Sequence, residues 1–423
     1  MVGSSELPSF YKLTVRERLE AVRKFANLTD EEEALLQQSC ALPLDQADRM
    51  IENVVGFMPL PLGVAVNFLI NNRNYLIPMV IEETSVVAAA SHAAKLARTR
   101  GGFITSSTGP YMIGQIQVVG VADPYGARMA ILSEKKEILD KANEQDPVLV
   151  SLGGGAKDVE VKVIETHVGL MVIAELTVDC KDAMGANAVN TMAEAVAPII
   201  ERITGGKVYL RIISNLATKR IARARVVVAK EELGREVVDG IVNAYAFAAA
   251  DPYRCATHNK GVMNGVIAVA LATGNDTRAL EAGAHAYAAR SGFYSPLTVW
   301  EKNSDGDLVG TIELPMAVGL VGGVTAIHPV AKVAVKILGV KTATELGEVM
   351  AAVGLAQNLA ALRALASEGI QKGHMGLHAR NLAVMAGAKG NMIDVVAERM
   401  IREKALKFHR AKELVEELTK RGK

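Results

Sequence analysis

The middle of the chain, residues 110–213, alternates strand and helix patterns and so differs from the sequence on either side of it. Residues 159–166 alternate apolar and polar side chains, which is the pattern of a half-buried strand. A first short strand is expected at 118–121. If it is left out, the order of the expected elements is βαββαβ, the ferredoxin-like split unit. The other strands are expected at 127–132, 170–178 and 207–213, and the helices at 133–143 and 187–203. The pattern therefore predicts a small domain inserted into a larger one.

The flanking sequence predicts a larger domain that is mainly helical. Thr14 and Thr29 each stand three residues before a glutamate, and both pairs match the capping box that begins a helix. Two hairpins interrupt the helices, one over residues 64–81 with an Asn-rich turn and one over residues 297–314. A glycine-containing interruption at 369–373 precedes the last helical element. The other helices are expected at 44–54, 86–98, 231–249, 261–272 and 276–290, and over most of the sequence after 314.

These patterns together predict an α+β fold. The chain of 423 residues is too long for one ordinary domain, and half of its residues are hydrophobic, which is enough for a substantial core. Residues 1–109 and 216–368 form the two parts of the large, mainly helical domain. Residues 110–215 form the inserted ferredoxin-like domain, and residues 369–423 form a helical C-terminal flap.

Charge and cysteine content exclude several classes of protein. A formal net charge of +1 gives no strong field to recruit nucleic acid or an anionic membrane. The three cysteines are far apart, so they support neither a zinc site nor a disulfide framework. Residues 1–10 lack the pattern of a signal peptide, and the uncharged stretch 314–331 contains glycines and prolines that argue against a membrane span. We therefore expect a cytoplasmic protein with no nucleic-acid or membrane partner.

One basic run departs from the even distribution of charge: Lys219, Arg220, Arg223 and Arg225. Such a cluster can sit near the phosphates of a ligand. It can also be the solvated face of a strand or helix, and this second interpretation is the one that the sequence favours.

Several common motifs are absent from the sequence. Neither GxGxxG, GxxxxGK[ST], HExxH nor GxSxG occurs, so the usual dinucleotide fold, the nucleotide P-loop, the metalloprotease helix and the hydrolase elbow are unsupported. His374 and His378 lie one helical turn apart, a spacing that can bind a metal. Their segment supplies no carboxylate or cysteine as a third ligand, so we expect no metal site.

Five short segments combine polar residues with glycines or tight turns. In this order, and over essentially the whole chain, they resemble the 3-hydroxy-3-methylglutaryl-coenzyme A (HMG-CoA) reductase family. The second class of that family, which lacks the membrane anchor of the first, is the most similar. The resemblance implies interconversion of HMG-CoA and mevalonate plus CoA by two successive hydride transfers with NADH or NADPH, and no metal. The five segments are residues 82–85, 182–187, 257–261, 274–277 and 373–380.

The resemblance implies four catalytic residues. Lys260 matches the lysine whose ammonium stabilises negative charge on the carbonyl oxygen. Glu83 matches the glutamate that donates a proton when mevaldehyde is reduced; near neutral pH a carboxyl group needs burial or a neighbouring acid for this. Asp276 matches the aspartate that bridges these two residues, and His374 matches the histidine that protonates the departing CoA thiolate.

Each of the four also has a structural alternative. Glu83 can be a carboxylate at a helix N-terminus, and Asp276 can be the N-cap of the helix that follows it. Lys260 can be an ordinary loop lysine, although a lysine that opens an apolar helix is unusual because the helix N-terminus disfavours a cation. A lone histidine is more often structural, but His374 lies among glycines near the end of the chain. That position suits a flap that closes over substrate.

The cofactor residues are implied in the same way. Asp182, Met184, Gly185 and Asn187 match the family's nicotinamide cofactor motif, at the start of an expected helix. Backbone N–H groups at a helix start suit a pyrophosphate.

A second position concerns the choice between the two cofactors. Asp146 stands where relatives that prefer NADH carry an aspartate, which can accept from the ribose 2′-OH and repels the 2′-phosphate of NADPH. Arg128, Lys141 and Lys157 lie nearby in the sequence and oppose this effect. The resemblance therefore implies a preference for NADH, with NADPH as the alternative.

The remaining matches concern the substrate and the assembly. Ser85 and Arg254 match residues that hold the HMG carboxylate, for which an arginine fork is well suited. Asn264 matches a polar partner of the catalytic residues. Residues 52–56 match the family's dimerisation motif, so a homodimer or an assembly of dimers is implied, with the active site at a subunit interface.

Three other functions remain open on the residues alone. The chain can be an NAD-dependent dehydrogenase for another acyl-CoA, or a CoA-binding acyltransferase without redox chemistry. A non-catalytic scaffold is the third, but it does not explain why Glu83, Lys260, Asp276 and His374 occur together.

Overall fold

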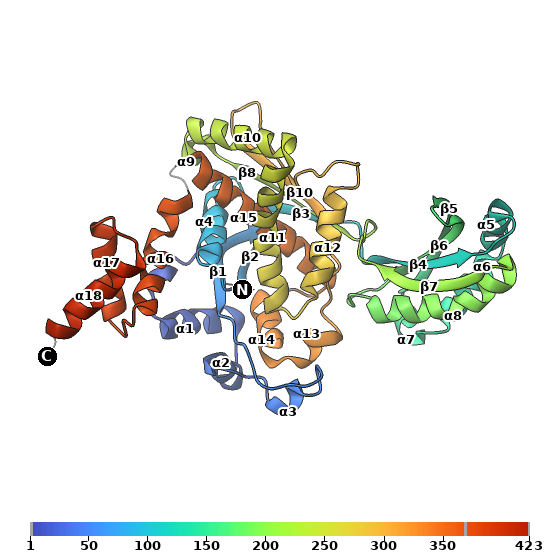
Figure 1. Ribbon diagram of the computed structural model, residues 1–423, viewed down its shortest axis with the longest axis horizontal. Coiled ribbons are helices and arrows are strands. Elements are labelled where there is room, and N and C mark those ends of the chain that lie inside the picture. Colours follow the sequence, from blue (N-terminus) through green and yellow to red (C-terminus); the bar gives the residue numbers. More distant parts are fainter. Residues whose placement is uncertain (1–2, 368–369, 422–423) are drawn as a thin grey trace.

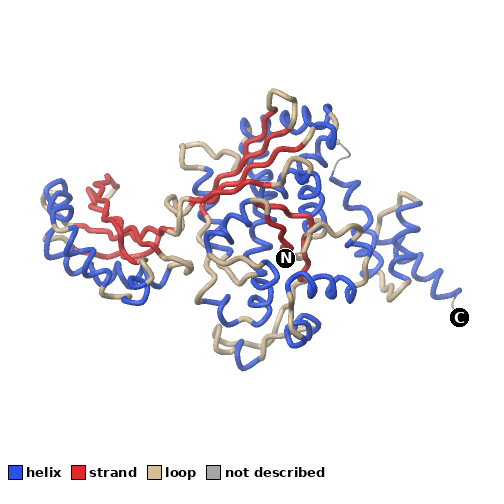
Figure 2. The backbone as a smooth tube through the Cα atoms, turned by 180° about the vertical axis from the view of Figure 1, so that it is seen from behind, coloured by secondary structure: helices blue, strands red, loops and turns tan. Residues whose placement is uncertain are grey.

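The computed structural model describes residues 3–367 and 370–421; the side chains of 370–377, 420 and 421 lie outside this description. Two sheets, one of six strands and one of four, belong to different units of the chain. Figure 1 shows the four-stranded unit at one end of the long axis, the C-terminal helices at the other end, and the six-stranded unit between them. From behind, in Figure 2, the strands of the two sheets form two distinct groups.

The large unit is built on the six-stranded sheet, in the order β2-β1-β3-β8-β10-β9. Both expected hairpins are present, and the first turns at Asn71 and Asn72, whose φ angles of 46° and 62° are left-handed values that asparagine tolerates. The sequence does not predict the central strands β3 and β8, in part because β8 alternates arginines with alanines rather than with β-branched residues. The strands are β1 (Leu62–Ile70), β2 (Arg73–Val80), β3 (Phe103–Ser107), β8 (Ile221–Val228), β9 (Thr298–Lys302) and β10 (Leu308–Pro315).

A single apolar helix, α15 (Ala343–Ala366), forms the centre of the large unit. It is long and apolar enough to cross a membrane by length and composition, but 67% of its most apolar window is buried inside the protein. A helix that is apolar on all sides belongs in a core, and α15 packs against the sheet and most extensively against three other helices. These three helices are α4 (Val86–Arg98), α10 (Arg235–Ala250) and α11 (Pro252–Ala272).

Two boundaries in the large unit differ from the prediction. α11 begins at Pro252 rather than at residue 261, because Asp251 caps it and proline is accepted in the first helical turn. Lys260 therefore lies inside a helix, and the expectation that it opens one is wrong. The helix expected over 231–249 is divided at Gly234 into α9 (Lys230–Leu233) and α10.

The N-terminal helices pack against one edge of the large unit. Both capping boxes are present. The threonine hydroxyls accept from Glu17 N and Glu32 N, and each glutamate carboxylate accepts from the backbone N–H of its threonine. The helix expected over 44–54 is wrong beyond α3 (Leu44–Ala47), and the segment after it has no regular structure until β1. The other elements here are η1 (Phe10–Lys12), α1 (Val15–Ala26), α2 (Asp30–Gln37), α12 (Thr277–Ala288), α13 (Gly323–Ile327) and α14 (Pro329–Leu338).

The small unit has a βαββαβ order, but its first strand, β4 (Tyr111–Val119), overlaps the strand at 118–121 that the prediction left out. Its strands pair antiparallel in the order β5-β6-β4-β7. The strand expected at 127–132 is wrong: these residues lie in a helix that starts at Pro124, where Asp123 provides the N-cap. The elements are β4 (Tyr111–Val119), α5 (Pro124–Ser133), α6 (Lys135–Asn143), α7 (Pro147–Ser151), β5 (Gly155–Thr166), β6 (Gly169–Asp179), α8 (Ala186–Thr204) and β7 (Lys207–Ser214).

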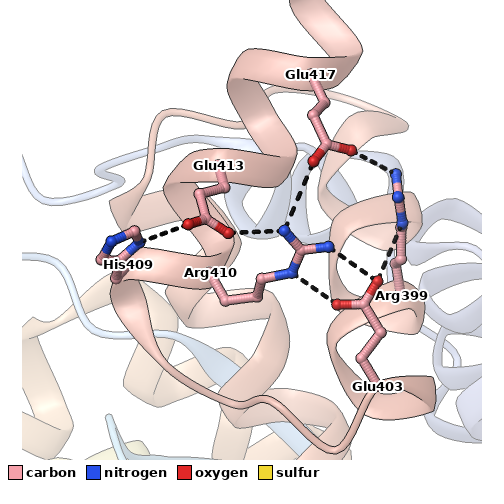
Figure 3. A network of polar contacts seen from close by, with 6 residues as sticks. All are labelled: Arg399, Glu403, His409, Arg410, Glu413 and Glu417. Atoms are coloured by element: carbon pink, nitrogen blue, oxygen red, sulfur yellow. Dashed lines mark hydrogen bonds and ion pairs between the residues drawn. The ribbon is translucent and has the colours of Figure 1, made fainter.

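The C-terminal helices have a hydrophobic core of their own, around Leu382, Val396 and Leu414. A polar network joins the last two helices: Arg410 contacts glutamates on both, and Arg399 contacts two of the same glutamates (Figure 3). The interruption expected at 369–373 falls partly on residues outside the described part, while 370–373 belong to a helix. The helices are α16 (Ile370–Met385), α17 (Met392–Arg402) and α18 (Phe408–Arg421).

Candidate active site

Three polar side chains meet at the turn that joins β2 to α4. Lys260 Nζ donates to Glu83 Oε2 over 2.6 Å, and Asn264 Nδ2 donates to the same oxygen over 3.3 Å. Lys260 and Asn264 lie four residues apart on α11, so both face the same side of that helix. The side chains of Lys260 and Glu83 are 59% and 40% exposed, so a substrate can reach both partners of the pair.

The buried side of α11 fixes the direction in which Lys260 points. Asn259 Nδ2 donates to Ser295 O over 3.0 Å, and Asn259 Oδ1 accepts from Leu297 N over 2.9 Å. His258 Nε2 lies 2.7 Å from Thr298 Oγ1. Because these buried bonds hold the helix against the segment before β9, the exposed face that carries Lys260 has a fixed orientation.

Ser85, at the start of α4, has a φ of 74°, a left-handed conformation in a residue other than glycine. Such strain costs about 1–3 kcal/mol and is found most often at functional sites. It directs the turn that carries Glu83 toward α11. Glu83 has a cation beside it and a side chain that is 40% exposed, so the burial that would favour a protonated carboxyl group is not present among the described residues.

Asp276 acts as the N-cap of α12. Its Oδ1 accepts from Arg278 N over 2.9 Å and from Ala279 N over 3.1 Å, and it also pairs with Arg278 Nη2 at 3.2 Å. Among the described residues it makes no hydrogen bond or ion pair with Lys260 or Glu83. The single chain therefore brings Glu83, Lys260 and Asn264 together. Asp276 instead caps α12, which is the structural alternative that the sequence left open.

Arg254 lies in the first turn of α11, and Asp251 Oδ1 accepts from its backbone N–H over 2.7 Å. Burial lowers the pKa of its guanidinium. No partner of this guanidinium is found in the described ranges, so its fork is available to an incoming carboxylate. His374 falls within α16, but its side chain lies outside the described residues.

The predicted cofactor motif forms the turn before α8. Asp182 Oδ1 accepts from Ala343 N, at the start of α15, over 2.8 Å, so this carboxylate joins the small unit to the central helix of the large one. Gly185 has a φ of 105°, and a Cβ there would lie 2.4 Å from Cys180 Sγ, so only glycine fits. Asn187 is exposed in the first turn of α8, whose free N–H groups can receive a pyrophosphate.

Asp146 serves as the N-cap of the short helix α7, with Oδ1 accepting from Leu149 N over 2.9 Å. The three nearby cations are engaged elsewhere. Lys141 pairs with Glu144, Lys157 Nζ donates to a backbone carbonyl, and Arg128 Nε donates to the carbonyl of residue 161.

The basic run 219–225 divides into two environments. Lys219 and Arg223 pair with Glu160 and Glu313 near the surface, as a solvated face predicts. Arg220 is only 4% exposed, so that interpretation is wrong for it. The basic run does not distinguish this buried arginine from its neighbours, and the apolar residue that follows it, Ile221, is the one local sign of burial.

Comparisons with known proteins identify the family of this chain. Residues 14–379 match the sequence profile of the family described as Hydroxymethylglutaryl-coenzyme A reductase. The 3-hydroxy-3-methylglutaryl-coenzyme A reductase of Archaeoglobus fulgidus is 63% identical over 98% of this chain and 95% of that protein. A probable reductase of the same name from Borreliella burgdorferi is 36% identical, over 84% of this chain and 82% of that protein.

The fold is similar to a solved class II reductase from Streptococcus pneumoniae, described as bound to NADPH in open conformations. The TM-score is 0.82 at 41% identity, covering 96% of this chain and 100% of that one. A second structure of the Streptococcus pneumoniae enzyme gives a TM-score of 0.84 over 97% of this chain and 99% of that one. The chain belongs to the hydroxymethylglutaryl-coenzyme A reductase family, and its fold is that of the class II members.

Proposed function

We propose that this chain interconverts HMG-CoA and mevalonate plus CoA by two hydride transfers with a nicotinamide cofactor. The observation that supports it most is the Lys260–Glu83 pair, with Asn264 donating to the same carboxylate. When bound, the reduced nicotinamide supplies two electrons and a proton as hydride in each transfer. In the reductive direction, two reduced cofactors and two protons convert HMG-CoA to mevalonate and free CoA.

Lys260 stabilises negative charge in both hydride transfers. As hydride adds to the thioester carbon, the carbonyl π-electrons move to oxygen, and an ammonium placed there lowers the barrier. The ammonium is held by α11 and exposed on one side, which leaves it free to contact the carbonyl oxygen. Asn264, one turn further along α11, keeps Glu83 in reach of the same oxygen.

Glu83 gives its proton to the alkoxide formed in the second reduction. It can carry that proton once substrate and a second subunit exclude water from the turn. Asp276 is proposed to tune both residues after a small movement of the α12 cap, since its Oδ2 makes no hydrogen bond within the described residues. The cap and the catalytic role are compatible, because they use different oxygens.

His374 is proposed to protonate the CoA thiolate when the hemithioacetal breaks down. The C–S bond breaks, the electron pair stays on sulfur, and the aldehyde carbonyl forms. α16, which carries His374, belongs to the C-terminal helices with their own core, and this suits a flap that moves as one body. Arg254 and Ser85 are proposed to hold the HMG carboxylate.

Residues 182–187 are proposed to hold the nicotinamide cofactor. The glycine at 185 lets the turn pack directly against Cys180, and the N-terminus of α8 can receive the pyrophosphate. A preference for NADH is proposed from Asp146, whose three neighbouring cations are engaged with other groups.

The proposed assembly is a homodimer in the cytoplasm. Residues 52–56 lie in the irregular segment before β1, where Ile51, Val55 and Met58 are 66%, 102% and 89% exposed. Exposed apolar side chains gathered in one segment indicate a surface that a partner covers. The resemblance supplies the partner, a second copy of this chain.

The direct test is to follow the absorbance of reduced nicotinamide with HMG-CoA, first with NADH and then with NADPH. The proposal expects two cofactors oxidised for each CoA released. CoA release without cofactor oxidation would instead indicate an acyltransferase. Oxidation with other acyl-CoA compounds but not with HMG-CoA would indicate a different dehydrogenase.

A further inference from the structure

Arg220 lies buried where the small unit returns to the large one. Its guanidinium donates to three backbone carbonyls: Nη1 to Ala183 O over 3.0 Å and to Met184 O over 3.1 Å, and Nη2 to Val318 O over 2.5 Å. Two of these carbonyls belong to the turn proposed to receive the nicotinamide. Arg220 makes no salt bridge within the described ranges, and these three hydrogen bonds all go to backbone carbonyls.

Burying a cation in this way is unfavourable unless every donor has a partner. Burial lowers the pKa of the Arg220 guanidinium, which reflects this desolvation. A neutral apolar side chain would fill the space without that penalty, but it would not hold three carbonyls in one geometry. The fork of an arginine gives directional bonds to several acceptors at once, which a lysine cannot reproduce.

The third acceptor connects the cofactor turn to the turn that carries Asp276. Val318 is followed by Gly319, whose N–H donates to Asn275 Oδ1 over 2.8 Å. A Cβ on Gly319 would lie 2.6 Å from Met184 N, so the two backbones touch here. The segment 318–319 is thus bonded to Arg220 on one side and to Asn275, the neighbour of Asp276, on the other.

Asp182 strengthens the same junction from the other direction. Its carbonyl accepts from Leu320 N over 2.8 Å and from Val321 N over 3.3 Å. The cofactor turn, the segment 316–321 and the Asn275–Asp276 turn therefore form one hydrogen-bonded unit, and Arg220 is the side chain that reaches its centre.

We propose that Arg220 is a positioning residue for hydride transfer, which fixes the carbonyls of Ala183 and Met184 and so sets the nicotinamide turn at a constant distance from the Asp276 turn. This inference rests on the proposed function. Arg220 touches neither substrate nor cofactor in it. A displacement of about 1 Å can slow a reaction about 100-fold, so the loss of this fork should slow hydride transfer much more than it weakens HMG-CoA binding.

Two variants test the proposal, Arg220→Lys, which keeps the charge but loses the fork, and Arg220→Met, which keeps only the apolar stem. We expect kcat to fall about 10- to 100-fold in both, while the KM for HMG-CoA changes by less than about threefold. With cofactor deuterated at the transferred position, the isotope effect on kcat should rise, because hydride transfer becomes rate-limiting. If Arg220→Met does not fold, Arg220→Lys alone tests the proposal.

Arg98 offers a matched control. It also donates to a backbone carbonyl from a poorly exposed position, with Nη1 bonded to Asn67 O over 2.9 Å. It lies in α4, and its other contacts are with Ser5, Glu6 and Asn74 rather than with the cofactor turn. Arg98→Lys should lower the midpoint of thermal unfolding without changing the isotope effect. If the Arg220 variants behave like Arg98→Lys, with only stability affected, the positioning role is wrong. An unmodified chain that oxidises no cofactor would overturn the proposed function itself, whatever the variants do.

Discussion

Lys260 Nζ lies 2.6 Å from Glu83 Oε2 although 177 positions separate the two residues in the sequence. α11 carries the lysine and the turn after β2 carries the glutamate, so the pair forms only when the large unit has folded around α15. An exposed ion pair contributes about 0–1 kcal/mol to stability, which is too little to explain a strained turn at Ser85. The arrangement is therefore better explained by chemistry at this point than by stability.

Replacing Lys260 should remove activity and leave the fold intact. We expect Lys260→Met to lower kcat about 100- to 1000-fold or more, because the carbonyl oxygen loses its stabilising charge. The midpoint of thermal unfolding should stay almost unchanged, since the pair is exposed. Lys302 is the control: it pairs with Asp239 at the same 2.6 Å and is 48% exposed, on β9. Lys302→Met should keep full activity, and an equal loss in both variants would contradict the assignment.

Replacing His374 should separate the two half-reactions. His374→Gln removes the proposed acid for the CoA thiolate, which is needed only when the thioester is reduced. We expect the rate with HMG-CoA to fall about 100-fold, while the reduction of free mevaldehyde falls much less. Both rates are measured by cofactor oxidation under saturating substrate. Equal losses in the two half-reactions would remove His374 from the thiolate role.

Cofactor preference should depend on the charge at Asp146. We expect kcat/KM to be higher with NADH than with NADPH in the unmodified chain. Asparagine is also a good N-cap, so Asp146→Asn keeps α7 capped and removes only the charge. That variant should raise kcat/KM with NADPH relative to kcat/KM with NADH about tenfold, because the negative charge that repels the 2′-phosphate is lost. Asp123→Asn, at the matching cap of α5, should leave the ratio unchanged. A chain that prefers NADPH from the start would refute the proposal.

Stability should fall in mild acid because of His258. Burial, and to a lesser extent the charge of Arg254, lowers the pKa of His258 to about 4, below its ordinary value of 6.5. The folded chain therefore keeps this histidine neutral, while the unfolded chain binds a proton as the pH drops below 6.5. The free energy of unfolding then decreases between pH 6.5 and 4, by up to about 1.4 kcal/mol for each pH unit.

Denaturant unfolding at several pH values between 6.5 and 4 measures how steeply the free energy of unfolding changes with pH, which is called the slope below. His258→Gln should reduce it, because the group that titrates differently in the two states is gone. His167 is exposed in the turn between β5 and β6, so His167→Gln is the control and should keep the slope of the unmodified chain. An unchanged slope in the His258 variant would show that other groups cause the acid effect.

The network around Arg410 should hold the last two helices together. Its contact with Glu403, 2.7 Å from Nε at the end of α17, joins the two helices, while its contact with Glu413, 2.7 Å from Nη1, lies within α18 (Figure 3). Arg410→Gln should increase hydrogen exchange in α18 while the midpoint of the large unit stays the same. The contact with Arg410 lowers the pKa of Glu403. The network is therefore intact at a pH above the ordinary pKa of a glutamate, and it is lost as the pH falls through the lowered pKa of Glu403.

A simpler ion pair provides the comparison. Arg380 Nε contacts Asp394 Oδ1 over 2.6 Å with both side chains more than half exposed, and it joins α16 to α17 alone. Arg380→Gln should leave the exchange of α18 unchanged. If the two variants give the same exchange pattern, the network has no special role.

Local signals in the sequence predicted much of the fold. The capping boxes at Thr14 and Thr29, the two hairpins and the later ββαβ part of the small unit are all present, because each depends on neighbouring residues or on a simple periodicity. Errors arose where one residue outweighs a pattern: Pro124 makes a helix of an apparent strand, and Pro252 starts α11 early. The central strands β3 and β8 were missed because their place is set by pairing with distant strands.

The candidate site was predicted in part. Glu83, Lys260 and Asn264 meet as expected, while Asp276 remains at its helix cap and the side chain of His374 lies outside the described residues. Arg220 could not be distinguished from its basic neighbours, because its burial results from contacts with residues that lie about 40 to 100 positions away. Sequence patterns record local preferences, whereas a buried polar group is defined by its tertiary partners.

The small unit is entered and left through adjacent strands on both sides of its boundary. Ser107 is paired with Ala222 in the large sheet, and Ile113 is paired with Ser214 in the small one. Both ends of the insertion are thus tied to each other twice, so the host sheet keeps its register on either side of residues 108–220. Exchanging the small unit for another would therefore leave the two connections in place, but it would also have to replace the bonds that Arg220 and Asp182 make across the boundary.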